Sequence, residues 1–173
     1  MNLWVKTMMV IEIFGENKAD EINNTIEGCR GIIIRGGTIL LSYQKNIDQY
    51  MIPGGGLEVG ESLRECAERE IAEECGVRAD AHTHFLTLEE YYHDTFFKSN
   101  YFVCGYVGEC DCALTETEIA EGLEPVWVEL NDAVRIFGEY NSFLDSHPMR
   151  YGMYYREHLA LAEFLRWDKE QKR

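Results

Sequence analysis

The strongest constraint on the fold lies between residues 52 and 76, where a glycine-rich segment is followed by an acidic helical pattern. The segment Ile52-Pro53-Gly54-Gly55-Gly56 disfavours regular structure because it combines one proline with three glycines, so it predicts a loop. Ser62 and Glu65 then have the Ser-x-x-Glu spacing of a capping box, and Gly76 is typical of a helix end. We therefore expect a loop followed by one helix of about four turns.

Three glutamates of this helix stand at positions i, i+3 and i+4: Glu70, Glu73 and Glu74. Their carboxylates share one helix face and repel each other by about 0.2–0.5 kcal/mol per pair. The last two also lie near the negative end of the helix dipole, which disfavours acids. Such conflicts are expected at functional sites, and Mg²⁺ would offset them because it prefers oxygen ligands. The alternative is a solvated acidic face stabilised by Arg64 and Arg69.

These residues resemble the box motif of the Nudix hydrolase family, in particular its mutator-type pyrophosphohydrolases. Gly55 is followed after five residues by Glu61 and, after seven more, by Arg69-Glu70-Ile71-Ala72-Glu73-Glu74-Cys75-Gly76-Val77. Every defined position of the motif is matched, so the resemblance is specific although it is sharp over these 23 residues alone. It implies an α/β fold, namely an α/β/α sandwich with a mixed central sheet, in which the motif forms a loop, a helix and a loop.

The resemblance also assigns roles to individual residues. Three glutamates would bind divalent cations, with Mg²⁺ expected and Mn²⁺ as an alternative: Glu70, Glu73 and Glu74. Arg69 would orient the first of these, and Glu61 would support that arrangement. Three glycines are expected to let the backbone approach a substrate phosphate: Gly54, Gly55 and Gly56.

The activity implied is hydrolysis of a phosphoanhydride in a nucleoside diphosphate linked to another moiety. Water would attack one phosphorus while Mg²⁺ polarises the phosphoryl oxygens, and the general base is left open. One alternative is a Nudix-fold module that binds a nucleotide without hydrolysis, which an eroded motif would favour. Another is isopentenyl-diphosphate isomerase, whose wider pattern is not apparent. The tyrosines Tyr91 and Tyr92 miss the position that marks one substrate class, so the substrate is not identified.

A fourth metal-linked acid is expected from the acidic segment 115–124, which we predict to be a loop. Glu121-Gly122 stands six residues before Trp127, as a glutamate and glycine do before a strand tryptophan in mutator-type members. This similarity favours Glu121 as a metal ligand or base. Glu118 and Glu116 are rivals for that role.

The remaining pattern predicts one domain over residues 1–173, with strands and helices intermixed. Expected elements are a strand at 4–14, hairpins at 31–41 and 81–107, a strand at 126–128, a helix from an Asn131 cap to Phe137, and a helix at 153–167. The first strand and the last helix are expected to be family-variable additions. The run from Met149 to Arg156 mixes tyrosines with arginines, which suits either base or phosphate contacts or a homodimer surface.

Charge and composition exclude several classes of function. The formal net charge of −15 opposes nucleic-acid binding, whereas a small nucleotide substrate can be held once divalent cations screen the carboxylates. No apolar run approaches the length of a membrane span and no secretory signal is visible, so we expect a cytoplasmic protein without membrane contact. The six cysteines are expected to be reduced; Cys110 and Cys112 are the one close pair, with thiol–metal binding as an alternative role.

Overall fold

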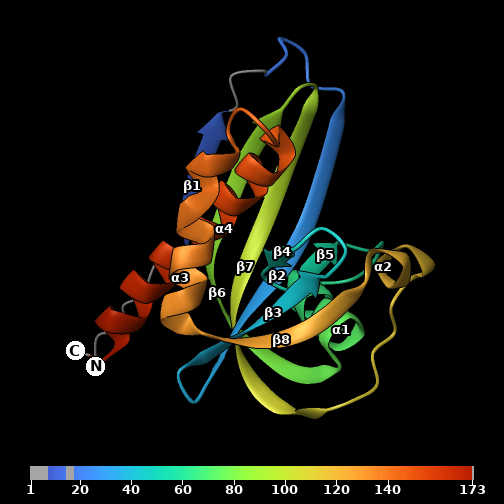
Figure 1. Cartoon of the computed structure of the whole chain (residues 1–173), viewed down its shortest axis with the longest axis vertical. Coiled ribbons are helices and arrows are strands. Elements are labelled where there is room, and N and C mark those ends of the chain that lie inside the picture. The colour runs from blue at the N-terminus through green and yellow to red at the C-terminus, as the bar shows by residue number, and fades with distance from the viewer. Residues whose placement is uncertain (1–7, 15–17, 173) are drawn as a thin grey trace.

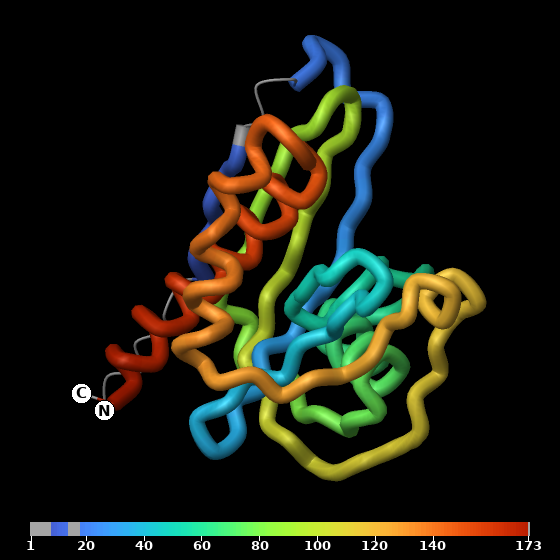
Figure 2. The backbone as a smooth tube through the Cα atoms, in the orientation of Figure 1, coloured from blue at the N-terminus to red at the C-terminus, as the bar shows by residue number. Residues whose placement is uncertain are grey.

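The computed structural model describes residues 8–14 and 18–172, and its centre is a mixed β-sheet. The strands of the described residues are β1 (Met9–Phe14), β2 (Asn24–Arg35), β3 (Thr38–Gln44), β4 (Gln49–Met51), β5 (Gly54–Gly56), β6 (Val77–Tyr92), β7 (Thr95–Glu109) and β8 (Leu123–Glu129). Their order is β1-β6-β7-β2-β3-β4, with β5 paired to β2 and β8 paired to β3. Strand β2 runs parallel to β7 over a long stretch, which can be followed in Figure 2.

Helices cover both faces of this sheet (Figure 1). They are α1 (Leu63–Cys75), α2 (Glu116–Glu121), α3 (Leu130–Gly138), the 3₁₀ helix η1 (Glu139–Phe143) and α4 (Pro148–Gln171). Alternate residues of β2 point to opposite faces, so Ile33 packs with α1 whereas Ile32 packs with α3 and α4. The expected α/β sandwich with a mixed central sheet is confirmed.

Several elements expected from local patterns are confirmed, with longer boundaries. The Gly36-Gly37 turn joins β2 to β3 with both glycines at positive φ, and His93-Asp94 joins β6 to β7. The strand expected at 126–128 is the centre of β8, and the C-terminal helix expected at 153–167 extends to Pro148–Gln171. Of the strand expected at 4–14, β1 forms the second part, and residues 4–7 lie outside the described part of the chain.

Three local expectations were wrong. Residues Gly54–Gly56 form the short strand β5 because they pair antiparallel with Gly28, Cys29 and Arg30 of β2. The acidic segment 115–124 contains the helix α2, which a capping box of Thr115 and Glu118 starts. Asn131 does not cap α3, because the helix begins at Leu130, whose backbone N–H donates to the carbonyl of Gly37.

None of the six cysteines, all of which lie in the described part of the chain, is in a disulfide. All six have free thiols; four are buried, Cys110 is half-buried and Cys112 is exposed. Among residues 8–14 and 18–172, no helix is both long enough and apolar enough to cross a membrane.

Candidate active site

The helix α1 carries the candidate site, and its two ends are set by local chemistry. The Ser62 side chain accepts a hydrogen bond from the backbone N–H of Glu65, whose carboxylate accepts one from Ser62 N. Gly76 ends the helix at φ 62°, a left-handed conformation that favours glycine. The predicted capping box and helix end are therefore confirmed, and they fix how the glutamates of α1 face the sheet.

Arg69 gathers three acidic side chains on one side of this helix. Its guanidinium donates to both oxygens of Glu61, at 2.8 and 3.0 Å, in a fork-like geometry. It also donates to Glu70 Oε1 at 2.8 Å and to Glu73 Oε2 at 3.0 Å. A further bond from Arg69 reaches the carbonyl of Gly56 at 2.9 Å, which ties the helix to the glycine segment.

The contacts with Arg69 lower the pKa values of these acids, whereas burial raises them, and the outcome differs between Glu61 and Glu70. The hydrogen bonds from Arg69 lower the pKa of Glu61. Burial raises the pKa of Glu70 in spite of Arg69, and the negative charges of Glu73 and Glu118 raise it further. The Glu70 carboxylate is thus a buried acid with too little positive charge around it.

Glu74 faces a different set of partners from the other motif acids. Its Oε2 accepts a hydrogen bond of 2.6 Å from Ser42 Oγ on β3 and one of 3.2 Å from Gly54 N. The side chain is buried, and burial raises its pKa to about 7 although Ser42, Arg30 and Gly54 lower it. Glu74 therefore stabilises the backbone of the glycine segment by accepting the hydrogen bond from Gly54 N.

Two of the three glycines of β5, Gly54 and Gly55, lie where no larger residue fits. Gly54 has φ 152°, and a Cβ there would collide with the carbonyl oxygen of Cys29. A Cβ on Gly55 would lie 2.5 Å from Glu70 Oε1. The backbone of the segment consequently approaches the Glu70 carboxylate directly, with no side chain between them.

The acids of α2 lie near the site, but their contacts differ. The Glu118 carboxylate accepts from Thr115 N at 2.7 Å, and its charge acts on Glu70. The Glu121 carboxylate accepts from Gln44 Nε2 at 2.5 Å. No described contact joins Glu121 to the acids of α1, so its metal-binding role stays a prediction.

Two polar residues of the site were not anticipated. Ser42 is fully buried on β3 beside Glu74, and Arg30 on β2 lowers the pKa of that acid. In the sequence, Arg30 lies between Cys29 and Gly31, and Ser42 follows the apolar residue Leu41. A polar residue in a predicted core strand was the signal that could have identified both.

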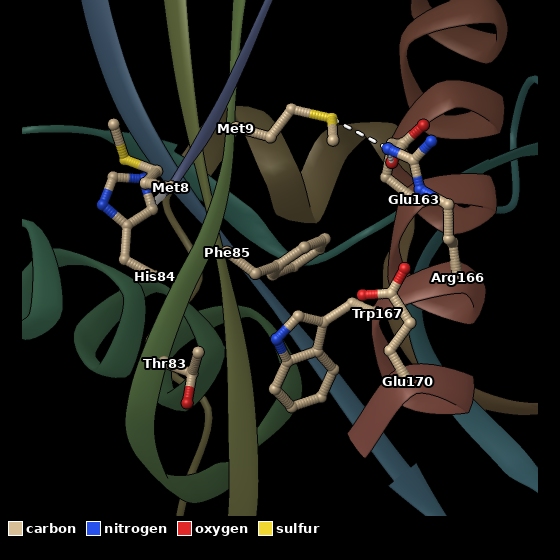
Figure 3. A pocket seen from close by; sticks show the side chains of 9 residues that line it. All are labelled: Met8, Met9, Thr83, His84, Phe85, Glu163, Arg166, Trp167 and Glu170. Carbon is tan, nitrogen blue, oxygen red and sulfur yellow. Dashed lines mark hydrogen bonds and ion pairs between the residues drawn. The ribbon is translucent and has the colours of Figure 1, made fainter. Parts of the chain in front are cut away.

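One surface hollow lies apart from these acids. It has a volume of about 240 Å³ and lies between β1, β6 and the last turns of α4, with Phe85 and Trp167 in its walls (Figure 3). Arg166 is already engaged there, with Glu163 and with the sulfur of Met9. The residues that line this hollow do not belong to the box motif.

Comparison with known proteins gives the family. The model of the NUDIX domain matches residues 28–146, which is more than half of the chain. The fold is similar to a NUDIX hydrolase from Nitrosomonas europaea, at TM-score 0.54 and 19% identity over 63% of this chain and 75% of that one. A MutT NUDIX hydrolase from Burkholderia pseudomallei matches at TM-score 0.50 and 20% identity, over 63% and 86% of the two chains. A UDP-X diphosphatase matches at TM-score 0.51 and 19% identity, over 63% and 53%. Together with the intact motif on α1, the domain match shows that this chain belongs to the Nudix family of hydrolases.

Proposed function

We propose that the enzyme is a Mg²⁺-dependent pyrophosphohydrolase that cleaves a phosphoanhydride in a nucleoside diphosphate linked to another moiety. One observation carries the proposal: Arg69 holds Glu61, Glu70 and Glu73 together beside a strand of glycines. This arrangement combines acidic oxygen donors with a glycine backbone that is exposed at Gly56, which suits a phosphate chain and its cations. A UDP-X diphosphatase has the same fold, so the fold accommodates a reaction of this class.

The donors of α1 fit a divalent cation by their chemistry. Among residues 8–14 and 18–172, no three Asp, Glu, His or Cys side chains form a ready-made metal site, and Arg69 engages Glu70 and Glu73 of α1. Yet Glu70 and Glu74 are buried acids with raised pKa values, and the charge of Glu70 contributes to the shift of Glu74. A hard cation with oxygen ligands would relieve that repulsion. We assign Glu70, Glu73 and Glu74 as the residues that would hold it, with Glu121 proposed as a fourth acid.

The residues of the chain would then act in distinct ways. When bound, Mg²⁺ supplies charge neutralisation at the phosphoryl oxygens and lowers the pKa of the attacking water. Gly54 and Gly55 let the backbone pass close to β2 and to the Glu70 carboxylate, and Glu74 fixes that backbone through its bond from Gly54 N. Arg69 orients Glu70 and Glu73, so it is a positioning residue that acts through these acids.

Product analysis with a substrate panel tests the proposal. Nucleotide sugars, dinucleoside polyphosphates, ADP-ribose and nucleoside triphosphates are incubated with the full chain, and release of nucleoside monophosphate is measured. We expect release from at least one diphosphate-linked nucleotide in Mg²⁺, complete loss in excess chelator, and recovery when Mg²⁺ or Mn²⁺ is returned. Hydrolysis that survives the chelator would contradict the metal-dependent mechanism.

Matched variants separate catalysis from folding. Glu73→Gln should lower kcat by orders of magnitude, because it removes a proposed cation ligand while its side chain, 40% exposed, tolerates the change. Glu68→Gln is the control: it lies on the same helix, but its carboxylate pairs with Arg64 at 2.9 Å and accepts from Ala81 N. If the panel gives nucleotide binding without cleavage, the chain is a binding module instead.

A further inference from the structure

A hollow of about 300 Å³ lies between the sheet and the first turns of α4. Figure 1 shows this part of α4 lying beside the long strands β6 and β7. The walls are mainly apolar, with Tyr92 and Phe97 from the strands and Met149 and Met153 from the helix. Aromatic rings and flexible methionines suit a flat group that stacks on its faces.

The hollow adjoins the proposed phosphate site. Arg30 lies in its wall and is the antiparallel partner of Gly54, whose N–H donates to Glu74. The positive charge of Arg30 also acts on the Glu74 carboxylate, so a residue in the wall of the hollow lies close to a motif acid. A substrate with its phosphates at the motif acids can therefore place another part of itself here.

The charges around the hollow cancel. Two arginines and two glutamates meet at its floor: Arg156 donates to the buried Glu157 at 3.1 Å, and Arg30 approaches Glu157 at 3.7 Å. Tyr101 donates to the same carboxylate at 3.2 Å. The second glutamate is Glu90, which forms an ion pair with Arg156. With its positive charges already paired, the hollow has no net attraction for a phosphate, which favours a neutral occupant.

Arg156 Nε has no hydrogen-bond partner in the described part of the chain, and the carboxylate of Glu90 has unused hydrogen-bonding capacity as well. The Glu90 side chain is 16% exposed, and its nearest cation is Arg156 Nη1 at 3.8 Å, beyond hydrogen-bond distance. Within the described part of the chain no donor forms a hydrogen bond with this carboxylate. The carboxylate can therefore accept from an N–H or O–H donor of a molecule that enters the hollow. Its cross-strand partner is Phe97, which places the acceptor beside an aromatic ring.

We propose that this hollow binds the nucleobase of the substrate and that Glu90 selects guanine. The inference rests on the proposed function and names its substrate class. Guanine presents two adjacent N–H donors that match the two carboxylate oxygens, and its O6 can accept from Arg156. Adenine presents one amino donor beside a ring nitrogen whose lone pair would face the carboxylate. Glu90 is thus a specificity-determining residue outside the box motif.

Binding of GMP and AMP to the full chain in Mg²⁺, measured by calorimetry, tests this inference. A good two-point contact to a base corresponds to about ten- to hundred-fold discrimination, so GMP should bind at least about ten-fold more tightly than AMP. Glu90→Gln should remove this preference, because an amide can accept from the adenine amino group and donate to the ring nitrogen. Hydrolysis of GDP-glucose and ADP-glucose should show the same change in kcat/KM.

Two further variants keep the test decisive. Glu89→Gln is the matched control, since Glu89 points to the opposite face of the same strand and should leave the preference unchanged. Phe97→Leu should weaken GMP and AMP equally, because it removes stacking and leaves the acceptor in place. Equal binding of GMP and AMP to the native protein, or an unchanged ratio in Glu90→Gln, would overturn the inference. Neither result affects the proposed function, which fails separately if no phosphoanhydride is cleaved.

Discussion

Replacing Glu74 by glutamine should stabilise the metal-free protein, and the gain should grow with pH. The Glu74 side chain is 7% exposed, and burial raises its pKa from 4.5 to about 7. Below pH 4.5 the carboxyl group is protonated in both folded and unfolded chains, so it imposes no penalty. Above pH 4.5 the unfolded chain releases the proton first, so the folded state loses stability until the pH passes about 7.

The size of the effect follows from that difference. Each pH unit between the two pKa values corresponds to about 1.4 kcal/mol, so ionised Glu74 destabilises the folded protein by roughly 3 kcal/mol at alkaline pH. Glutamine can still accept from Ser42 or Gly54 N, and it carries no charge. The difference in unfolding free energy between Glu74→Gln and the native chain should therefore rise from near zero at pH 4.5 to about 3 kcal/mol at pH 9.

Urea unfolding in excess chelator at several pH values measures this difference, with Glu73→Gln as the matched control. The Glu73 side chain is 40% exposed and precedes Glu74 on the same helix, so this variant controls for the removal of one carboxylate from α1. Added Mg²⁺ should stabilise the native chain at pH 9 more than the Glu74→Gln variant, because it binds the folded state through that carboxylate. A pH-independent difference for Glu74→Gln would refute the assignment of Glu74 as a strained buried acid.

Three further predictions concern the same site. Glu121→Gln should lower kcat at least about ten-fold whereas Glu118→Gln stays near the native rate; kinetics with the reverse ranking would transfer the fourth-acid role to Glu118. Ser62→Ala should cost about 1 kcal/mol of unfolding free energy through loss of the N-cap, and Ser62→Asp should retain it; equal urea midpoints would contradict the cap. Arg69→Lys should lower kcat at least about ten-fold because an ammonium cannot form the fork, whereas Arg64→Lys should not; a native rate in Arg69→Lys would show that charge alone suffices.

The parts of the fold that the sequence predicted are those that local chemistry determines. Ser62, Glu65 and Gly76 set the ends of α1 through hydrogen bonds and backbone conformations within a few residues, so their spacing was enough. The Gly36-Gly37 hairpin is local in the same sense. The motif acids could likewise be identified before their geometry was known.

The errors arose where distant contacts or short length decide the structure. The glycines 54–56 form β5 because β2 supplies hydrogen-bond partners more than twenty residues away, which a glycine-rich composition does not reveal. Helix α2 is six residues long, too short for a periodic apolar pattern, although its Thr115-Glu118 capping box was visible in the sequence. Helix α3 begins at Leu130, whose N–H donates to the carbonyl of Gly37 in the turn between β2 and β3. The prediction that Asn131 caps this helix was therefore wrong.

The motif acids illustrate how packing overrides local preference. Helix α1 has no basic residue in its last turn, so Glu73 and Glu74 oppose the helix dipole there. Their compensation is tertiary: Arg69 pairs with Glu73 across one turn, while Ser42 and Gly54 donate to Glu74 from the sheet. Those partners lie on elements that also pack the core against α1, so the core fixes the positions of the carboxylates. The folded chain therefore provides the energy that gathers the acids, and a divalent cation would have only to neutralise acids that are already held in place.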